Sequence, residues 1–416
     1  MLVEFAVENF KSFKDEAVFS MLASPDSSLS ANIVENALKE DSLVRSAAIY
    51  GANASGKTNL VAAMSILLQL VLNSQNYQFG QPLPFFPFKL DPECLEKPTK
   101  MSVCYIHKGV EYRFGVSFNK SKVIGEYLYY YPNNKKSIIF ERANTADYKF
   151  NADRATQEEI RKLTSENVLY LSKAAQNNYS KAQDALDWFR NGLTVIGPDN
   201  PDFLVSLGME MLRQDPTLKP FMLKALEKAD LGIDDFSTDF NPAPQEELAK
   251  LYPLLPPDLA KQVMDGKNQL ISYEIRTRHK GVEFNFELEE SAGTKRLFGL
   301  TGFFIDALRK GKVLFVDELD TRLHYELNAF LVSLFHDESQ NKENAQLVFT
   351  THNVKLLNLD FFRRDQIWFS KKSAEDGSTE LYSLAEFSER KDRDIEKAYL
   401  AGRYGAVPFI KDNKVL

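Results

Sequence analysis

Hydrophobic and polar residues alternate near the start of the chain and again after residue 100. Residues 2–22 open with the pattern VEFAV at positions 3–7, which predicts one or two strands of a half-exposed sheet. Residues 100–150 also alternate and are rich in aromatic side chains, and the Pro-Asn-Asn at 132–134 predicts a hairpin turn between two strands. Together these segments predict a sheet with one buried face.

Three short apolar runs show no alternation, at residues 47–50, 313–318 and 346–350. Such runs are typical of parallel strands that are buried on both faces. Apolar, helix-forming stretches follow at residues 59–72 and 297–308. We therefore expect a second, buried sheet with helices packed against it.

The segments between these elements differ in character. Residues 24–46 are rich in Ser, Asn and Asp and predict a loop, while residues 79–98 carry five prolines and predict an irregular connector. Residues 151–268 are rich in Ala, Glu, Lys and Leu without sustained heptads, so we expect a compact helical lobe there. The expected parts are thus 1–150, a helical insertion at 151–268, and 269–416.

Composition limits the class of protein. The formal charge of −7 and the pI near 5.5 argue against non-specific coating of nucleic acid. Cys94 and Cys104 are too few for a disulfide scaffold and are expected to be buried free thiols. The N-terminus does not resemble a signal peptide, and no apolar stretch approaches the roughly 20 residues that span a bilayer. We expect a cytoplasmic protein without membrane contact.

Residues 51–58 read GANASGKT, which fits the phosphate-binding pattern GxxxxGK[ST]. A buried strand precedes the motif and a helix follows it, so backbone N–H groups and the helix dipole would face a phosphate. Lys57 would reach the β- and γ-phosphates of ATP, and Thr58 would hold Mg²⁺. The residues expected at the nucleotide are Gly51, Asn53, Ala54, Ser55, Gly56, Lys57, Thr58 and Asn59.

Two of the buried runs end in polar side chains that suit hydrolysis. Asp317 and Glu318 follow the strand at 313–316; the aspartate would bind Mg²⁺ through water, and the glutamate could act as general base on the attacking water. His352 follows the run at 346–350 and could contact the γ-phosphate and orient Glu318. The alternative for the acidic pair is a core strand that ends in two exposed acids.

A second candidate anion site lies at residues 290–296, ESAGTKR, directly before a predicted helix. One bound ATP has only one triphosphate, and this turn follows the first motif by more than two hundred positions (291 − 58 = 233). The turn is therefore expected to act on the nucleotide of a partner chain.

The order of these four motifs resembles that of ABC-type ATPases and, more narrowly, of their SMC-like branch. In that family the first motif is Walker A, which corresponds to residues 51–58, and the second is the signature, which corresponds to Ser291, Ala292 and Gly293. Walker B and its catalytic glutamate correspond to Asp317 and Glu318, and the switch histidine corresponds to His352. The N-terminal NFKSF at 9–13 is similar to a segment with which SMC-like proteins touch the nucleotide, which implies Lys11 and Ser12 as further contacts.

The resemblance implies an α/β fold, namely an ABC-type P-loop ATPase head with a mixed sheet flanked by helices and an antiparallel β lobe. Residues 1–150 and 269–416 would form the two halves of that head, and 151–268 would form the inserted helical lobe. The signature reads ESAGT where ABC transporters have LSGGQ, and His324 stands where transporters have the D-loop aspartate.

The chain is still more similar to a prokaryotic subfamily of stand-alone, AAA-labelled ABC-type ATPases found in phage-defence and abortive-infection systems. The segments that carry this similarity include VENFKSFKDE at 7–16, DELDTRLHYEL at 317–327 and TTHN at 350–353. The subfamily also resembles the ATPase part of overcoming-lysogenization-defect nucleases. Because 64 residues follow His352 (416 − 352 = 64), no room is expected for their C-terminal nuclease domain.

The resemblance implies an ATPase that uses ATP and Mg²⁺, forms a homodimer or higher homo-oligomer around the nucleotide, and serves as a switch in antiviral defence. A separate effector, a nuclease or a toxin, is the expected partner. The alternative is an SMC-like DNA repair or recombination ATPase that binds nucleic acid directly. That alternative needs a basic surface, and its candidates, which a solvated face would also explain, are the pairs at 295–296, 363–364 and 371–372. A transporter subunit is disfavoured by the unusual signature and the large insertion, and a nucleotide-binding scaffold without turnover remains as a further alternative.

Overall fold

The structure is a computed structural model, and its described residues fall into two compact units. The first unit combines Met1–Pro198 with Ala307–Leu416, and the second is Asp199–Asp306. The residues that the structure describes are 1–39, 41–197, 201–243, 270–387 and 394–407.

The first unit contains a six-stranded sheet with the order β11-β15-β16-β5-β17-β18. All neighbouring strands from β11 to β17 run parallel, and only β18 runs antiparallel, to β17. Strands β5, β15 and β16 are buried at every position, as their apolar runs predict. The six strands are β5 (Ser46–Tyr50), β11 (Leu193–Ile196), β15 (Val313–Val316), β16 (Gln346–Thr350), β17 (Ile367–Lys372) and β18 (Thr379–Ser383).

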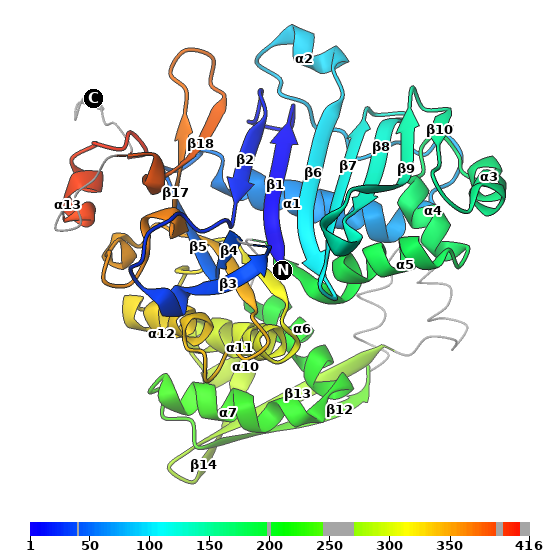
Figure 1. Ribbon diagram of the computed structural model, residues 1–416. Helices are drawn as coiled ribbons and strands as arrows, with labels where there is room; N and C mark the ends of the chain where they lie inside the picture. The colour runs from blue at the N-terminus through cyan, green and yellow to red at the C-terminus, as the bar shows by residue number, and fades with distance from the viewer. Residues whose placement is uncertain (40, 198–200, 244–269, 388–393, 408–416) are drawn as a thin grey trace, which may run out of the picture. The chain divides into compact units, whose positions relative to one another are not determined.

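A seven-stranded antiparallel sheet with the order β10-β9-β8-β7-β6-β1-β2 forms the other large sheet of this unit (Figure 1). The predicted turn at Pro132–Asn134 lies between β8 and β9, as expected. The strands of this sheet and of the short two-stranded sheet β3-β4 are β1 (Leu2–Glu8), β2 (Ala17–Ser20), β3 (Ile33–Leu38), β4 (Asp41–Val44), β6 (Thr99–His107), β7 (Val110–Phe118), β8 (Val123–Tyr130), β9 (Ser137–Ala143) and β10 (Asp147–Lys149).

Helix α1 (Lys57–Asn73) belongs to the same hydrophobic core as both large sheets, and it passes behind the antiparallel sheet in Figure 1. Its buried face includes Leu60, Met64 and Leu67, which follow the spacing of a single helix face. No helix within the described ranges is long and apolar enough to cross a membrane. The unit's other helices are α2 (Pro92–Glu96), α3 (Arg154–Lys162), α4 (Tyr170–Gln176), α5 (Ser180–Asp187), α12 (Tyr325–His336) and α13 (Ile395–Leu400).

The second unit packs helices against a three-stranded sheet with the order β12-β13-β14. A Cβ atom on Gly299 would lie 2.9 Å from the backbone of Leu204 and Val205, so glycine allows two helices of this unit to approach closely. Its elements are α6 (Pro201–Gln214), α7 (Lys219–Lys228), α10 (Phe286–Glu289), α11 (Ala292–Lys310, whose last turn belongs to the first unit), β12 (Asp235–Pro242), β13 (Ile271–His279) and β14 (Val282–Asn285).

The predicted α/β class, with buried parallel strands, flanking helices and an antiparallel lobe, is confirmed, but some local predictions differ from the structure. The segment at 24–46, expected to be a loop, contains β3 and β4. The segment at 151–268, expected to be helical, contains two strands, β11 and β12. Strand β11 has four residues, too few to show a period, and is held by parallel pairing with β15, whereas β12 pairs antiparallel with β13. Residues 198–200 and 244–268 of the expected helical segment lie outside the described residues, and the second compact unit extends from 199 to 306.

Both cysteines are buried free thiols, as the sequence predicts. Cys94 lies on α2, and Cys104 lies on β6 beside Glu111. Burial, with the Glu111 carboxylate adding to it, raises the pKa of the Cys104 thiol to about 12. The thiolate that reacts with oxidants or electrophiles is therefore scarce at this residue at neutral pH.

His336 is a buried histidine, the last residue of α12, and its ring packs against Phe361 and Phe362. Its Nε2 lies 2.7 Å from the Ser46 hydroxyl, and the Gln366 amide donates toward it at 3.4 Å. Burial, with a smaller contribution from Arg45, lowers the pKa of His336 to about 3. The folded protein therefore holds this imidazole in its neutral form.

This burial predicts a loss of stability in acid. The unfolded chain binds a proton at His336 below about pH 6.5, whereas the folded chain does so only near pH 3, so folding becomes less favourable as the pH falls between these values. The contribution reaches about 1.4 kcal/mol per pH unit in that window. Chemical denaturation of the parent and of His336→Gln from pH 8 to pH 4 measures it. The difference in free energy of unfolding between parent and variant should be constant above pH 7. Below pH 6 the parent should lose stability relative to the variant. If the two free energies change in parallel with pH, the assignment is wrong.

Candidate functional site

The phosphate-binding motif forms the turn between β5 and α1. Ala54 and Gly56 have left-handed backbone angles, with φ of 61° and 113°. A Cβ atom on Gly56 would overlap the hydroxyls of Thr379 and Ser12, so only glycine fits there. The turn thus brings the first N–H groups of α1 to the carboxyl edge of the parallel sheet, where an anion would meet them.

Two hydroxyl groups from the far end of the chain hold this turn. Ser370 Oγ donates to the carbonyl of Ser55 at 2.9 Å, and Thr379 Oγ1 donates to the same carbonyl at 2.8 Å. These residues come from β17 and from the first residue of β18. Sequence analysis did not identify either one, because the segment carries no motif and its role follows only from the pairing of β17 with β5.

Lys57 lies inside the turn, with 6% of its surface exposed. Its ammonium group donates to the carbonyls of Gly51 at 2.8 Å and Ala52 at 3.1 Å. Burial lowers the pKa of Lys57, while the carboxylates of Asp317, Glu318 and Asp320 oppose that shift. The predicted phosphate-binding lysine and the predicted acidic pair therefore lie in one electrostatic environment.

Asp317 is fully buried at the end of β15. Its Oδ1 accepts a hydrogen bond from the Thr350 hydroxyl, whereas its Oδ2 has no hydrogen-bond partner among the described residues. Burial raises the pKa of Asp317, and the hydroxyls of Thr350 and Thr58 lower it. A buried, unsatisfied carboxylate oxygen close to the Thr58 hydroxyl fits a divalent cation that prefers oxygen ligands, such as Mg²⁺.

Glu318 has a φ of 49°, a left-handed conformation that costs a non-glycine residue free energy. Its backbone N–H donates to the Thr350 hydroxyl at 2.7 Å, and its Oε2 accepts from Thr321 Oγ1 at 3.1 Å. Thr350 therefore contacts both members of the acidic pair. A strained backbone of this kind is a feature common at functional sites.

His352 follows β16 at the same edge of the sheet. Its backbone N–H donates to the carboxylate of Asp320 at 3.1 and 3.3 Å. Burial and the positive charge of Lys57 lower the pKa of His352, although Asp320 and Glu318 oppose the shift. The imidazole is therefore neutral at pH 7. Asp320 was not predicted; its place three residues after Asp317 was the available signal.

The two expected contacts from the N-terminal segment differ in position. The Asn59 amide donates to Ser12 Oγ at 2.7 Å, and the Ser12 hydroxyl in turn lies 2.7 Å from Thr379 Oγ1, which can accept its proton, so Ser12 packs directly against the motif. Lys11 is exposed, and its backbone N–H donates to the carbonyl of Phe86 at 2.6 Å. Asn53 and Ala54 are also exposed, at the mouth of the turn.

The predicted signature turn belongs to the second unit. Ser291 Oγ accepts the backbone N–H of Thr294 at 3.1 Å and so caps α11, whose first residues are Ala292 and Gly293. Ser291 and Ala292 are exposed. Lys57, Asp317 and His352 thus lie together in the first unit, whereas the 291–293 turn belongs to the second unit.

The basic pairs proposed for direct DNA binding are only partly at the surface. Arg363 is buried, forms an ion pair with Asp365 at 2.8 Å, and donates to backbone carbonyls of residues 24–28. Arg296 is 1% exposed. The expectation that these pairs lie on a solvated or DNA-binding face is therefore wrong for both arginines, because both are buried. The Lys371 side chain is 41% exposed, but it forms an ion pair with Glu380.

Comparison with solved structures gives distant similarity to SMC head domains. An SMC head bound to the C-terminal winged-helix domain of ScpA has a TM-score of 0.43 and 14% identity, covering 92% of this chain and 97% of that one. An SMC head domain from Thermotoga maritima has a TM-score of 0.41 and 12% identity, covering 92% and 98%. An SMC head with an extended coiled coil, bound to the C-terminal domain of ScpA and derived from Pyrococcus furiosus, has a TM-score of 0.40 and 14% identity, covering 97% and 98%. TM-scores this low carry no argument about the site.

Among curated proteins, none matches this chain. A family model does match, over residues 46–358, which is well over half of the chain and extends from β5 through the phosphate-binding motif and Asp317 to His352. The matched range therefore contains the elements that the structure gathers at the edge of the parallel sheet. The chain belongs to the family described as "AAA domain, putative AbiEii toxin, Type IV TA system".

Proposed function

We propose that this protein is an ABC-type ATPase that binds ATP and Mg²⁺ between two copies of the chain and acts as a nucleotide-driven switch. One observation carries the proposal: Glu318 is held in a strained turn beside the buried Asp317, and a neutral histidine lies at the same edge as the phosphate-binding lysine. A protein that only binds nucleotide would not need the strained glutamate.

Each residue has a distinct role in this proposal. The N–H groups of the 51–58 turn and Lys57 hold the β- and γ-phosphates. Asp317 and Thr58 would hold Mg²⁺, which neutralises phosphate charge during transfer. Glu318 accepts a proton from the attacking water, and neutral His352 keeps that water and the γ-phosphate aligned. Asp320 fixes the backbone of His352 and thereby its position.

The proposed dimer completes the site. The 291–293 turn offers a capped, exposed helix start in the second unit, which suits an anion such as the γ-phosphate. In a two-fold dimer each chain would present this turn to the nucleotide held by its partner, so two equivalent sites form or neither does. ATP would then stabilise the dimer, and hydrolysis would release it.

We further propose that the switch serves antiviral defence in the cytoplasm. The description of the family, which names a putative toxin and a toxin–antitoxin system, supports a role in growth arrest or abortive infection. The expected partner is a separate effector, a nuclease or a toxin, whose activity the ATP-bound and ADP-bound states would control. Direct DNA binding is less favoured, because Arg296 and Arg363 are buried.

Glu318→Gln tests the assignment of the general base. The amide cannot accept the proton, so the rate of ATP hydrolysis should fall by about 10²–10⁴-fold while ATP is still bound. The variant should also accumulate as an ATP-dependent dimer. Steady-state phosphate release and mass in solution, with and without ATP–Mg²⁺, measure both effects. Unchanged turnover would remove Glu318 from this role.

Mixing two inactive variants tests whether the site is shared between chains. Lys57→Ala should abolish turnover by removing the phosphate-binding ammonium, and Ser291→Arg should abolish it by blocking the helix start. In the mixed dimer the intact motif of one chain meets the intact Ser291 of the other. Random pairing therefore restores about a quarter of parental turnover if the two sites act independently. No recovery, with mixed dimers demonstrated by mass, would show that Ser291 acts on its own chain's nucleotide or not at all.

A further inference from the structure

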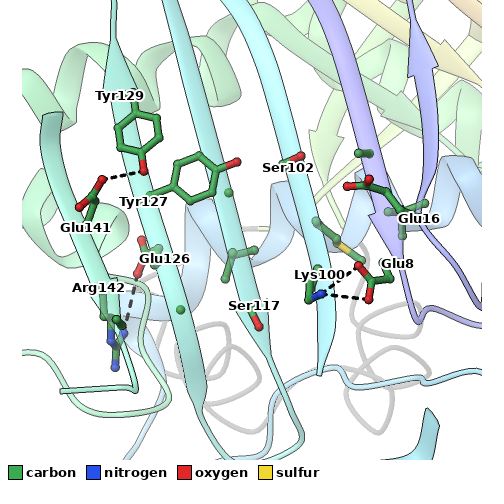
Figure 2. A pocket seen from close by; sticks show the side chains of 17 residues that line it. Glu8, Glu16, Lys100, Ser102, Ser117, Glu126, Tyr127, Tyr129, Glu141 and Arg142 are labelled. Carbon is green, nitrogen blue, oxygen red and sulfur yellow. Dashed lines mark hydrogen bonds and ion pairs between the residues drawn. The ribbon is translucent and has the colours of Figure 1, made fainter. Parts of the chain in front are cut away.

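The outer face of the antiparallel sheet carries a hollow of about 380 Å³ that is separate from the nucleotide motif (Figure 2). The strand register explains why the surface is sunken there. Ala6, Ser102 and Gly115 lie side by side on β1, β6 and β7, and Ser117 and Gly125 are neighbours on β7 and β8. Small side chains on adjacent strands leave a trough that larger residues would fill.

Tyr127 forms one wall of this trough. Its ring passes over Gly115, where a Cβ atom would overlap it, and it stacks on Tyr129 with centroids 4.7 Å apart. Figure 2 shows the Tyr127 hydroxyl pointing across the sheet toward Ser102, with Glu8 and Glu16 on the opposite side. The glycine therefore allows an aromatic ring to lie across the sheet surface.

Tyr127 and Tyr129 occupy alternate positions of β8 and therefore share one face of the sheet, and Tyr131 follows directly after the strand. Two of the three rings carry a cation from this chain: Lys136 Nζ lies 3.6 Å from the centroid of Tyr129, and the guanidinium carbon of Arg113 lies 5.0 Å from that of Tyr131. Among the described residues, no lysine or arginine lies over Tyr127. The ring that borders the trough is thus the one without a cation.

The charge around the trough favours a positive ligand. The outer-face groups that line it comprise three carboxylates, Glu8, Glu16 and Glu141, and one ammonium, Lys100. Glu8 pairs with Lys100, and Glu141 pairs with Lys149 and accepts from Tyr129, whereas exposed Glu16 forms no ion pair within the described part of the chain. Nucleic acid is disfavoured, because its phosphates would meet these carboxylates.

Glu16 is placed to act together with Tyr127. Extending the pairing of Val7 with Ala17 by one residue sets Glu16 opposite Glu8, whose carboxylate Lys100 already pairs. Burial raises the pKa of the Tyr127 hydroxyl, a hydrogen bond with the Ser102 side chain and the charge of Arg113 lower it, and the Glu16 carboxylate makes a smaller upward contribution. A cation between the Tyr127 ring and the Glu16 carboxylate would supply the ion pair that Glu16 lacks among the described residues and would place a cation beside the third tyrosine as well.

We infer that this trough is a docking site for an arginine side chain presented by a partner protein, with the guanidinium over Tyr127 and paired with Glu16. Arginine is favoured over lysine because a planar guanidinium both stacks on an aromatic ring and bonds a carboxylate through two N–H groups. The site faces away from the sheet's buried side, and the inference does not depend on the proposed ATPase activity.

A pentapeptide, acetyl-Gly-Ala-Arg-Ala-Gly-amide, tests the inference on the full chain. 3-Fluorotyrosine is placed at position 127, and its ¹⁹F resonance is followed during titration. The arginine peptide should give a saturable shift, and the same peptide with citrulline, a neutral isostere, should bind about tenfold more weakly or not at all. Equal binding of the two peptides, or no shift with either, would overturn the inference. So would a shift caused by a hexathymidylate oligonucleotide but not by the arginine peptide.

Matched variants locate the effect. Glu16→Gln should weaken the arginine peptide about tenfold, whereas Glu96→Gln, which neutralises another exposed glutamate outside the trough, should bind like the parent. In unlabelled protein followed by calorimetry, Tyr127→Phe should retain binding and Tyr127→Ala should lose it. Thermal unfolding verifies that each variant is folded. Parental affinity in Glu16→Gln or in Tyr127→Ala would overturn the assignment.

Discussion

Parallel pairing of β5, β15 and β16 is the constraint on which the candidate site depends. Because parallel neighbours end at the same edge of a sheet, the phosphate-binding turn, the acidic pair and His352 reach one place although up to three hundred positions separate them in sequence. Complete burial of the three strands fixes their order and register. Thr350, the last residue of β16, then joins the strands chemically, because its hydroxyl contacts both Asp317 and the N–H of Glu318.

A single buried amide connects this parallel sheet to the antiparallel one. Gln346, the first residue of β16, donates to the carbonyls of Leu2 and Val44 at 3.1 Å each and accepts the N–H of Leu2 at 2.6 Å. A fully satisfied buried side chain of this kind specifies one arrangement, because any other would leave polar groups unpaired. The two sheets thus share a core and also a polar contact at the start of the chain.

Residues in short sequence motifs could be predicted from the sequence, whereas elements held in place by strands far away along the chain could not. The motif at 51–58, the pair at 317–318 and His352 each stand at the end of an apolar run, and the structure places them as that pattern predicts. Strand β11 has four residues and no period, and β17 and β18 carry no motif, so their positions follow only from strands elsewhere in the chain. Ser370, Thr379 and Asp320 were missed for the same reason: their roles arise from three-dimensional contacts and not from local spacing.

The contact of Ser370 and Thr379 with the Ser55 carbonyl has a consequence for the order of synthesis. The two hydroxyls belong to residues that are translated 315 and 324 positions after Ser55. At about 5–20 residues per second, the ribosome needs tens of seconds to cover that interval. During this time the phosphate loop of the nascent chain lacks the hydrogen bonds from Ser370 and Thr379. For most of the interval Asp317, Glu318 and His352 are not yet synthesised either. A chain that stops before Thr379 therefore cannot complete the turn, and a finished phosphate loop marks a polypeptide that has been translated at least that far.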